Sequence, residues 1–409
     1  MEEWKEYKLG DLIVLSSGGT PNKSNSSYWG GDIPWISAKA MYDDYLYSSD
    51  ITITREGLNN GSKLAPVNSI LLLTRGSGLF NRIPVCLVKR EMAFNQDVKC
   101  IESINQNIVS TLFLFYWLIG NKQEISNILE TTGIGAGKID TERLKSIHIK
   151  LPPILIQQVL IIFAESLMLK IEINRRINDN LEQQAQALFK SWFVDFEPFK
   201  DGEFVESELG KIPKGWKVLS LSTIANFLNG LAMQKYRPTG TDKGIPVLKI
   251  KELGQGHCDS SSDLCSTSIE RKYKVENGDV IFSWSGTLLI DIWCGGLCGL
   301  NQHLFKVTSK DYPKWFFFLW TKEHLRNFIH IANDKAVTMG HIKRGHLDEA
   351  KVLAPPQNDL DKMTKTMLPI IEEIVKKKIE CRKLAQLRDT LLPRLMSGKI
   401  KVGDLPLNN

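Results

Sequence analysis

The sequence predicts an α+β fold in which two β-rich globular domains are separated by two long helices that pair as an antiparallel coiled coil. Three observations predict it. The chain repeats itself, the first part of each repeat has short apolar runs between Gly and Ser residues, and the second part is a glycine-free stretch with an apolar heptad pattern. The tandem duplication also predicts a pseudo-two-fold arrangement of the two halves.

The duplication is visible as short motifs that recur in the same order along the chain. The matched pairs are Trp4-Lys5 with Trp216-Lys217, Ile33-Pro34 with Ile245-Pro246, Gly76 with Gly286, Asn95-Gln96 with Asn301-Gln302, and Pro152-Pro153 with Pro355-Pro356. The separation between the copies drifts slowly, as small differences in loop length would produce. Each half is therefore one copy of an ancestral unit of about 200 residues.

The first part of each half is expected to be a sheet with a few covering helices. Short apolar or alternating runs at 33–37, 69–73 and 147–151 are typical of strands, and Gly, Ser, Thr and Asn between them are typical of loops. Apolar residues at helical spacing in 112–128 and 314–331 predict helices that pack on the sheets.

A long helix is expected after each Pro-Pro pair, at roughly 157–196 and 359–395, where the chain is rich in Leu, Ile, Lys, Glu and Gln. Apolar residues recur there at alternating spacings of three and four, which is the pattern of a coiled-coil seam. Polar members of the seam are expected to fix its register. The predicted seam comprises Leu160, Leu167, Ile171, Asn174, Asn178, Leu181, Leu188, Ile370, Ile374, Lys377, Leu384 and Leu391.

These patterns predict the boundaries of six segments. They are a first globular domain at 1–152, a central long helix at 153–197, a linker at 198–213, a second globular domain at 214–355, a C-terminal long helix at 356–400 and a tail at 401–409.

The composition is that of a globular protein without a secretory signal. Of 409 residues, 43% are hydrophobic and 24% charged, and the net charge of +6 permits a polyanionic partner without requiring one. Charges in the first eight residues argue against a signal peptide, and the apolar runs are shorter than the roughly 18 residues that a membrane span needs. We expect a cytoplasmic protein whose seven cysteines are reduced thiols.

No catalytic or metal-binding motif stands out in the sequence. Residues 133–138 resemble a phosphate-binding loop, but they are one residue short and lack the following Ser or Thr. An adenine methyltransferase needs Asn or Asp before a Pro-Pro-aromatic run, and neither Pro-Pro pair has one. His257, Cys258, Cys265, Cys294, Cys298 and His303 miss the usual zinc spacings, so no metal is expected. The chain is predicted to bind rather than to catalyse.

Three stretches resemble the specificity subunits of type I restriction-modification enzymes. Residues 180–199, NLEQQAQALFKSWFVDFEPF, resemble the central conserved region of that family. Residues 207–216, SELGKIPKGW, resemble the entry to its second target-recognition domain, and 387–400 resemble its C-terminal helix end. After Pro153 the chain departs from the family pattern, because Ile154-Leu155-Ile156-Gln157 lacks the acidic residue often found there.

The resemblance implies a non-catalytic subunit in which each globular domain is a target-recognition domain that reads one half of a split, asymmetric site in double-stranded DNA. The helices would set the number of unread base pairs between the halves and dock two methylation subunits. S-adenosylmethionine would bind to those subunits, and ATP and Mg²⁺ to restriction subunits that translocate DNA, so no cofactor is expected in this chain. The outer faces of the helices, including Phe189, Phe193, Met363 and Met396, are candidate docking surfaces.

DNA contacts need cations for phosphates and amide, hydroxyl or guanidinium groups for base edges. Polar residues that flank Gly76 and Gly286, or that follow the 33–35 and 245–247 runs, meet this need. The alternative is that they are solvated turns. The candidates of this kind are Ser37, Lys39, Arg75, Ser77, Lys249, Lys251, Trp284, Ser285 and Thr287. The remaining candidates are the basic loop residues Lys63, Arg82, Lys235 and Arg237. The shared pairs Asn95-Gln96 and Asn301-Gln302 are expected to be structural, because the two halves should read different sequences.

Other classes of protein remain as alternatives. A standalone duplicated DNA-binding regulator or anti-restriction protein would share this architecture without needing methylation subunits. A coiled-coil scaffold would not need two globular domains rich in loop glycine. A fused methyltransferase and specificity polypeptide is disfavoured, because the catalytic motifs are missing from the sequence.

Overall fold

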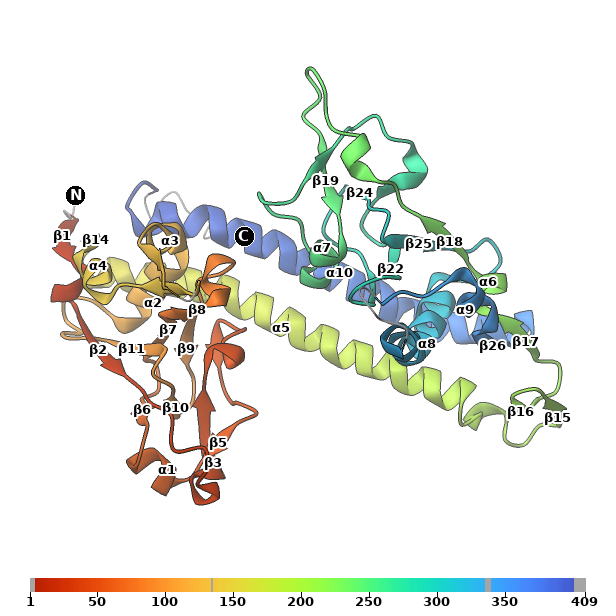
Figure 1. The fold of residues 1–409 in the computed structure, drawn as a ribbon, viewed down its shortest axis with the longest axis horizontal. Coiled ribbons are helices and arrows are strands. Elements are labelled where there is room, and N and C mark those ends of the chain that lie inside the picture. The colour runs from red at the N-terminus through yellow and green to blue at the C-terminus, as the bar shows by residue number, and fades with distance from the viewer. Residues whose placement is uncertain (1–3, 134, 335–339, 401–409) are drawn as a thin grey trace. The chain divides into compact units, whose positions relative to one another are not determined.

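The computed structural model describes residues 4–133, 135–334 and 340–400, and it confirms the α+β fold class. The chain divides into two compact units. Unit 1 contains Met1–Leu169 and Ala385–Asn409, and unit 2 contains Lys170–Leu384. Each unit has one β-rich domain and a segment of both long helices (Figure 1).

The first domain is built on two main sheets and a pair of strands that joins its beginning to its end. β1 (Lys5–Lys8) pairs antiparallel with β14 (His148–Leu151). The first main sheet has five strands in the order β2 (Ile13–Ser17), β11 (Val98–Ser103), β7 (Ile70–Leu73), β9 (Val85–Val88) and β4 (Tyr45–Leu46). The second has four strands in the order β5 (Thr52–Ile53), β3 (Trp29–Ile36), β10 (Met92–Phe94) and β6 (Lys63–Ala65).

The second domain repeats this topology. β17 (Lys217–Ser220) pairs antiparallel with β26 (Lys351–Ala354), as β1 does with β14. One main sheet has four strands in the order β18 (Asn226–Asn229), β25 (Leu304–Thr308), β22 (Val280–Ser283) and β23 (Ile290–Ile292). The other has four strands in the order β20 (Leu264–Cys265), β19 (Ile245–Leu248), β24 (Cys298–Leu300) and β21 (Lys274–Val275). One parallel pair occurs at the same place in each domain, β3 with β10 and β19 with β24. The predicted duplication is thus present in the strand order.

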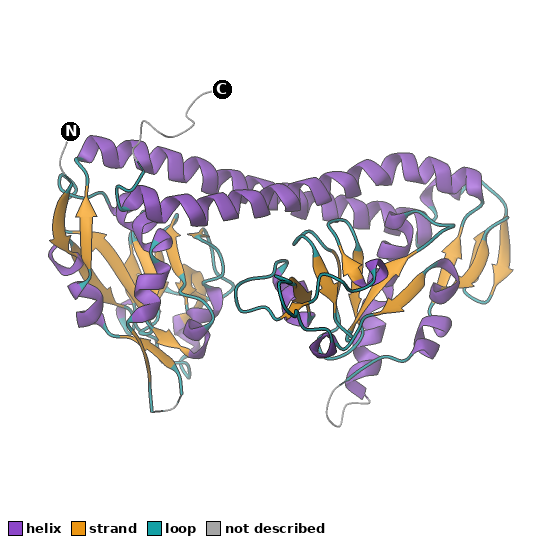
Figure 2. Ribbon diagram, turned by 90° about the horizontal axis from the view of Figure 1, so that it is seen from above, coloured by secondary structure: helices purple, strands orange, loops and turns teal. Residues whose placement is uncertain are grey.

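Helices cover these sheets, as the strands and helices in Figure 2 show. The helix predicted at 112–128 is divided into α2 (Thr111–Gly120) and α3 (Lys122–Asn127), while 314–331 lies within α8 (Lys314–Asp334). At Gly120 an added Cβ would lie 3.2 Å from Leu392, so the backbone passes close to the C-terminal helix. The short helices are α1 (Arg55–Asn59), α4 (Thr141–Ser146), α6 (Leu221–Ile224), α7 (Ile250–Gln255) and α9 (Arg344–Glu349).

The two predicted long helices are α5 (Ile154–Phe193) and α10 (Gln357–Met396). Each begins directly after a Pro-Pro pair, where proline's fixed φ and missing N–H are tolerated. Gln157 is fully buried at the start of α5. Its amide donates to the carbonyls of Ile108 and Pro152, each at 2.9 Å, and accepts from the Ser110 N–H at 3.1 Å. This glutamine therefore fastens α5 to the loop that leads into α2.

Within each unit, the α5 and α10 segments belong to one core and run antiparallel. In unit 1, Leu160 and Ala164 of α5 share a core with Leu392 and Leu395 from the end of α10. In unit 2, Phe189 from the end of α5 shares a core with residues from the start of α10. The predicted seam residues that are buried are Leu160, Leu167, Ile171, Asn174, Asn178 and Ile374, and those that are half-buried are Leu181, Leu188, Ile370, Lys377, Leu384 and Leu391.

The suggestion that Phe189, Phe193, Met363 and Met396 form docking surfaces is wrong. All four are at most 5% exposed. Phe193 packs edge to face on Phe316, with ring centroids 5.7 Å apart, and lies 5.5 Å from Trp216. The heptad pattern marks only the face toward the other helix, whereas the globular domains cover a second face of each helix.

The segment predicted as a linker contains regular structure. A β-hairpin, β15 (Phe204–Ser207) and β16 (Gly210–Pro213), follows α5. Phe196 and Phe199 contact the Trp216 ring at 5.7 and 5.1 Å between centroids. The aromatic residues of the motif at 180–199 therefore attach the end of α5 to the second domain.

In the part of the chain that the structure describes, one helical stretch, 154–199, is long and apolar enough to cross a membrane by length and composition alone, with 44% of its most apolar window buried. The expectation that every apolar run is too short to cross a membrane was therefore wrong. Gln157 and Gln158 interrupt the run, but its mean hydropathy stays high enough for a membrane span. Ile161, Ala164 and Met168 of this stretch lie in the core of unit 1.

The seam carries a polar residue that we expect to reduce stability. Asn174 is fully buried, and within the described residues neither polar atom of its side chain makes a hydrogen bond of normal geometry, although its amide lies near enough to Glu380 to help lower the pKa of that carboxyl. Because an unsatisfied buried amide costs about 1–3 kcal/mol, Asn174→Leu should raise the thermal midpoint by a few degrees. Scanning calorimetry would measure it, with Gln183→Leu on the exposed face of α5 as the control. A lower midpoint for Asn174→Leu would contradict this expectation.

Candidate nucleic-acid interface

In both domains a glycine turn lies against a distant loop. In the first domain, β8 (Arg75–Gly76) pairs antiparallel with β13 (Gly137–Ile139), and Gly76 lies opposite Gly137. In the second, the Gly286 N–H donates to the Gly340 carbonyl at 2.9 Å, and the backbones of Ser285 and His341 form an isolated antiparallel β-bridge. With φ of 152° and 65°, Gly76 and Gly286 adopt backbone conformations that favour glycine. We call these two places the glycine turns.

The glycine turn of the first domain is cationic. Arg75 and Ser77 are exposed there, and Lys138 lies opposite Arg75 on β13. Lys99 on the neighbouring sheet donates to the Ser17 hydroxyl. Burial and then the nearby Arg75 charge lower the pKa of Lys99, so these cations are close enough to repel one another. A polyanion would relieve that repulsion.

The side chains beside the glycine turn of the second domain are an aromatic ring and uncharged hydroxyl groups. The Trp284 indole donates to the Asn229 side chain at 3.0 Å and stacks on Phe305, with centroids 5.7 Å apart. Ser285 is buried, and its hydroxyl is hydrogen-bonded to Nδ1 of His303 at 2.9 Å. Thr287 is exposed beside Gly286. The same topological position thus presents different hydrogen-bonding groups in the two domains.

The shared asparagines shape their own turns. Asn95 Oδ1 accepts from the Asp97 N–H at 3.2 Å, and Asn301 Oδ1 accepts from the His303 N–H at 3.3 Å. Both are 7% exposed. The structural role predicted for this shared pair is confirmed for the asparagines.

Three of the predicted DNA-contacting cations are engaged within the protein. Arg82 donates to the carbonyls of Met41 and Tyr42. Lys249 pairs with Asp263, and Lys251 donates to Ser261 at 2.9 Å and lies 3.8 Å from Asp259. A DNA contact by these side chains would require breaking those interactions.

The remaining candidates lie at or near strand ends and short turns. Lys39 is exposed in the 3-10 turn Ala38–Ala40, next to the half-buried Ser37. Lys63 is exposed at the start of β6, and Lys235 is exposed in the turn Met233–Lys235. Arg237 lines a small cavity of about 140 Å³. Two further polar residues line this cavity: Asn301, which the sequence predicted to be structural, and Gln234, which was not singled out because only its position in the fold brings it beside Arg237.

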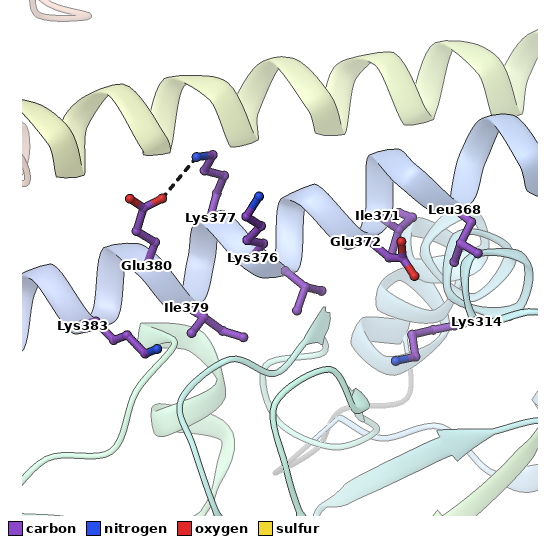
Figure 3. A pocket seen from close by; sticks show the side chains of 10 residues that line it. Lys314, Leu368, Ile371, Glu372, Lys376, Lys377, Ile379, Glu380 and Lys383 are labelled. Carbon is purple, nitrogen blue, oxygen red and sulfur yellow. Dashed lines mark hydrogen bonds and ion pairs between the residues drawn. The ribbon is translucent and has the colours of Figure 1, made fainter.

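A larger groove, of about 660 Å³, lies along α10 beside the start of α8 (Figure 3). Its apolar residues include Leu368, Ile371 and Ile379, and Lys314, Lys376 and Lys383 lie around them. The seam residue Lys377 also lines it and donates to Glu380 at 3.1 Å. The groove therefore combines apolar and charged side chains.

The structure shows no metal centre among the residues that it describes, since no group of three or more His, Cys, Asp or Glu is placed to hold an ion. All seven cysteines are free thiols.

Charged residues connect the second domain to the helices of unit 2. Lys378 of α10 lies 2.8 Å from Asp291 of β23 and 3.3 Å from Glu182 of α5. Lys322 of α8 donates to the same glutamate at 3.2 Å. Burial raises the pKa of Glu182, but Lys378 and Lys322 outweigh burial, so the pKa is lowered overall.

The fold defines a duplicated protein in which the two glycine turns share one topological position and carry different side chains. The model of a family described as "Type I restriction modification DNA specificity domain" matches residues 1–183 and 213–382. The chain belongs to this family.

Similar proteins extend over the whole chain. The MjaIX specificity subunit of Methanocaldococcus jannaschii, a type I restriction enzyme component, is 29% identical over 99% of this chain and 95% of its own. The HindI specificity subunit of Haemophilus influenzae is 22% identical over 98% of this chain and 100% of its own. The crystal structure of the S subunit from M. genitalium aligns with a TM-score of 0.54 and 16% identity, covering 97% of this chain and 96% of that one, which shows a shared fold.

The Glu182 network predicts a pH-dependent contribution to stability. Because the folded-state pKa of Glu182 is lowered, its stabilising effect is present above the ordinary glutamate pKa and is lost as the pH falls through the folded-state value. Glu182→Gln should reduce stability near neutral pH by about 1 kcal/mol, a small figure because the side chain is partly exposed. The difference from the unsubstituted protein should vanish in acid. Denaturation at several pH values would test this, with the exposed Glu372→Gln as the control.

Proposed function

We propose that this chain is the non-catalytic DNA-specificity subunit of a type I restriction-modification complex, in the cytoplasm. Each globular domain reads one half of a split, asymmetric site in double-stranded DNA. The helices set the spacing between the halves and dock two methylation subunits, which restriction subunits join. The methylation subunits carry S-adenosylmethionine and the restriction subunits use ATP and Mg²⁺, so the chain needs no cofactor of its own.

The single observation that carries the proposal is the difference between the two glycine turns on one shared topology. Arg75, Ser77 and Lys138 offer guanidinium, hydroxyl and ammonium donors in the first domain. Trp284 and Thr287 offer an aromatic ring and a hydroxyl in the second. Arginine pairs well with guanine, while hydroxyl and apolar groups suit other base edges, so the two turns favour different sequences. The relatives reported above are named as specificity subunits, which favours this function over a standalone regulator.

Docking of the methylation subunits is supported by a stripe on α5. Leu155, Ile162 and Leu169 are 65%, 67% and 37% exposed. They recur every seven residues and therefore share one face of the helix. An exposed apolar stripe of this kind is typical of a protein–protein contact.

The function is tested by mapping methylated adenine after the chain is coexpressed with its methylation subunits. The unsubstituted chain should produce one split, asymmetric motif. The double variant Arg75→Ala/Ser77→Ala should alter or relax one half of the motif only, and Trp284→Ala/Thr287→Ala the other half only. Lys310→Ala, an exposed change away from both turns, is the control. A motif that changes in both halves, or in neither, would contradict the assignment of one domain to each half.

Arg75 is expected to contribute affinity as well as sequence preference. Arg75→Ala should weaken binding of the complex to its cognate duplex by about 1–3 kcal/mol and reduce the salt dependence by about one counterion. Fluorescence anisotropy at several salt concentrations would measure both quantities. Arg55→Ala, an exposed arginine of the same domain, should change neither.

The α5 stripe predicts a separate loss of assembly. Ile162→Asp places a charge in the middle of the stripe and should reduce copurification of the methylation subunit at least tenfold, because burying an unpaired carboxylate is costly. The isolated chain should keep its thermal midpoint, since Ile162 is exposed in it. Gln186→Asp, which is also exposed on α5 but lies seventeen residues beyond the last residue of the stripe, is the matched control. Equal recovery of both variants would exclude this face as the contact.

A further inference from the structure

Two cysteines of the second domain meet although they are far apart in the sequence. Cys258 lies in the loop that follows α7, and Cys298 begins β24. Their Sγ atoms are 3.4 Å apart and hydrogen-bonded. Both side chains pack in one small core with Leu253 and Trp293.

The two thiols have different surroundings. Cys298 is fully buried, whereas Cys258 is half-buried and therefore reachable from solvent. With Cys298 as the donor, the hydrogen bond lowers the pKa of Cys258 and raises that of Cys298. Cys258 is thus the better nucleophile, and the buried sulfur of Cys298 lies next to the Cys258 sulfur.

The other thiols lack this arrangement. Cys86 and Cys100 lie on β9 and β11, which β7 separates in the sheet. Burial raises the pKa of Cys265 and of Cys294 to about 11. Thiols of this kind stay protonated near neutral pH and react slowly with oxidants.

We propose that Cys258 and Cys298 form an oxidation site at which a hydroperoxide converts the two thiols into a disulfide. The Cys258 thiol releases its proton, the thiolate attacks one peroxide oxygen and the O–O bond breaks. The alkoxide or hydroxide that leaves takes up that proton and becomes alcohol or water. Cys298 then attacks the sulfur of the resulting sulfenic acid. The S–S bond forms, the S–O bond breaks, and hydroxide leaves with the Cys298 proton as water. The two thiols lose two electrons in total, and the peroxide gains them.

The disulfide would alter a loop beside the candidate DNA contact Lys251. Bond formation brings the sulfurs from 3.4 Å to about 2.05 Å. Asp259, the next residue, lies 3.8 Å from Lys251, and Ser262 donates to the buried Glu252 at 3.1 Å. Oxidation would therefore tie the loop at 256–263 to β24, and it would modify the second domain while leaving the first unchanged. This inference does not depend on the proposed function.

The test is a thiol map of the full-length chain before and after brief treatment with hydrogen peroxide. Alkylation followed by proteolysis without reductant should yield a peptide pair cross-linked through Cys258 and Cys298, and the titratable thiols should fall by two from the seven present. Dithiothreitol should restore them. Amide exchange in 256–263 should slow in the oxidised chain. Full alkylation of both cysteines after peroxide, or a cross-link between other cysteines, would overturn the proposal.

Two variants separate the roles of the thiols. Cys258→Ser should abolish the cross-link and leave Cys298 reduced. Cys298→Ala should let dimedone trap a sulfenic acid at Cys258, because the second thiol is missing. Cys381→Ala removes another half-buried thiol and should leave the cross-link intact. Dimedone labelling at Cys298 in Cys258→Ser would reverse the assigned roles and contradict the proposal as stated.

Discussion

Burial of the apolar faces of α5 and α10 is the constraint on which the rest of the structure depends. Each helix has 40 residues, and a helix in a folded protein gains most of its stability from tertiary packing of its apolar face. In unit 1 the end of α10 supplies Leu392, Leu395 and Met396 to the core of the first domain. In unit 2 the end of α5 supplies Phe189 and Phe193 to the core of the second. Each domain is therefore completed by a helix segment from the other half of the sequence.

This shared scaffold lets the two halves differ in chemistry without differing in fold. Asn95 and Asn301 form the same local hydrogen bond in both halves, so these residues shape their turns in the same way. Arg75 and Ser285 occupy equivalent positions beside their glycines, but one is an exposed cation and the other a buried hydroxyl. A duplicated protein that must distinguish two half-sites needs this separation between residues that shape a turn and residues that a ligand meets.

Local patterns in the sequence predicted the element types and the helix seam well, because heptad spacing and strand alternation depend on neighbours in the chain. They were wrong in predicting that Phe189, Phe193, Met363 and Met396 lie on exposed docking surfaces, since helical periodicity does not show how many faces of a helix are covered. They also missed the β15–β16 hairpin, where Gly210 with φ of 87° makes the turn. The division of 112–128 into α2 and α3 falls at Gly120-Asn121, where the Asn121 amide donates to the Trp117 carbonyl at 2.8 Å and α10 passes close to Gly120.

For the candidate site, the sequence by itself determined which loops repeat and which residue types flank the glycines. Only the tertiary structure decided which of those residues are available. Arg82, Lys249 and Lys251 look like Arg75 in the sequence, but carbonyls, carboxylates and a hydroxyl from distant segments already bind them. The contact between Cys258 and Cys298 likewise exists because β24 passes beside the loop after α7. Repeats and periodicity are local properties of a chain, whereas pairing of side chains is set by which segments fold against one another.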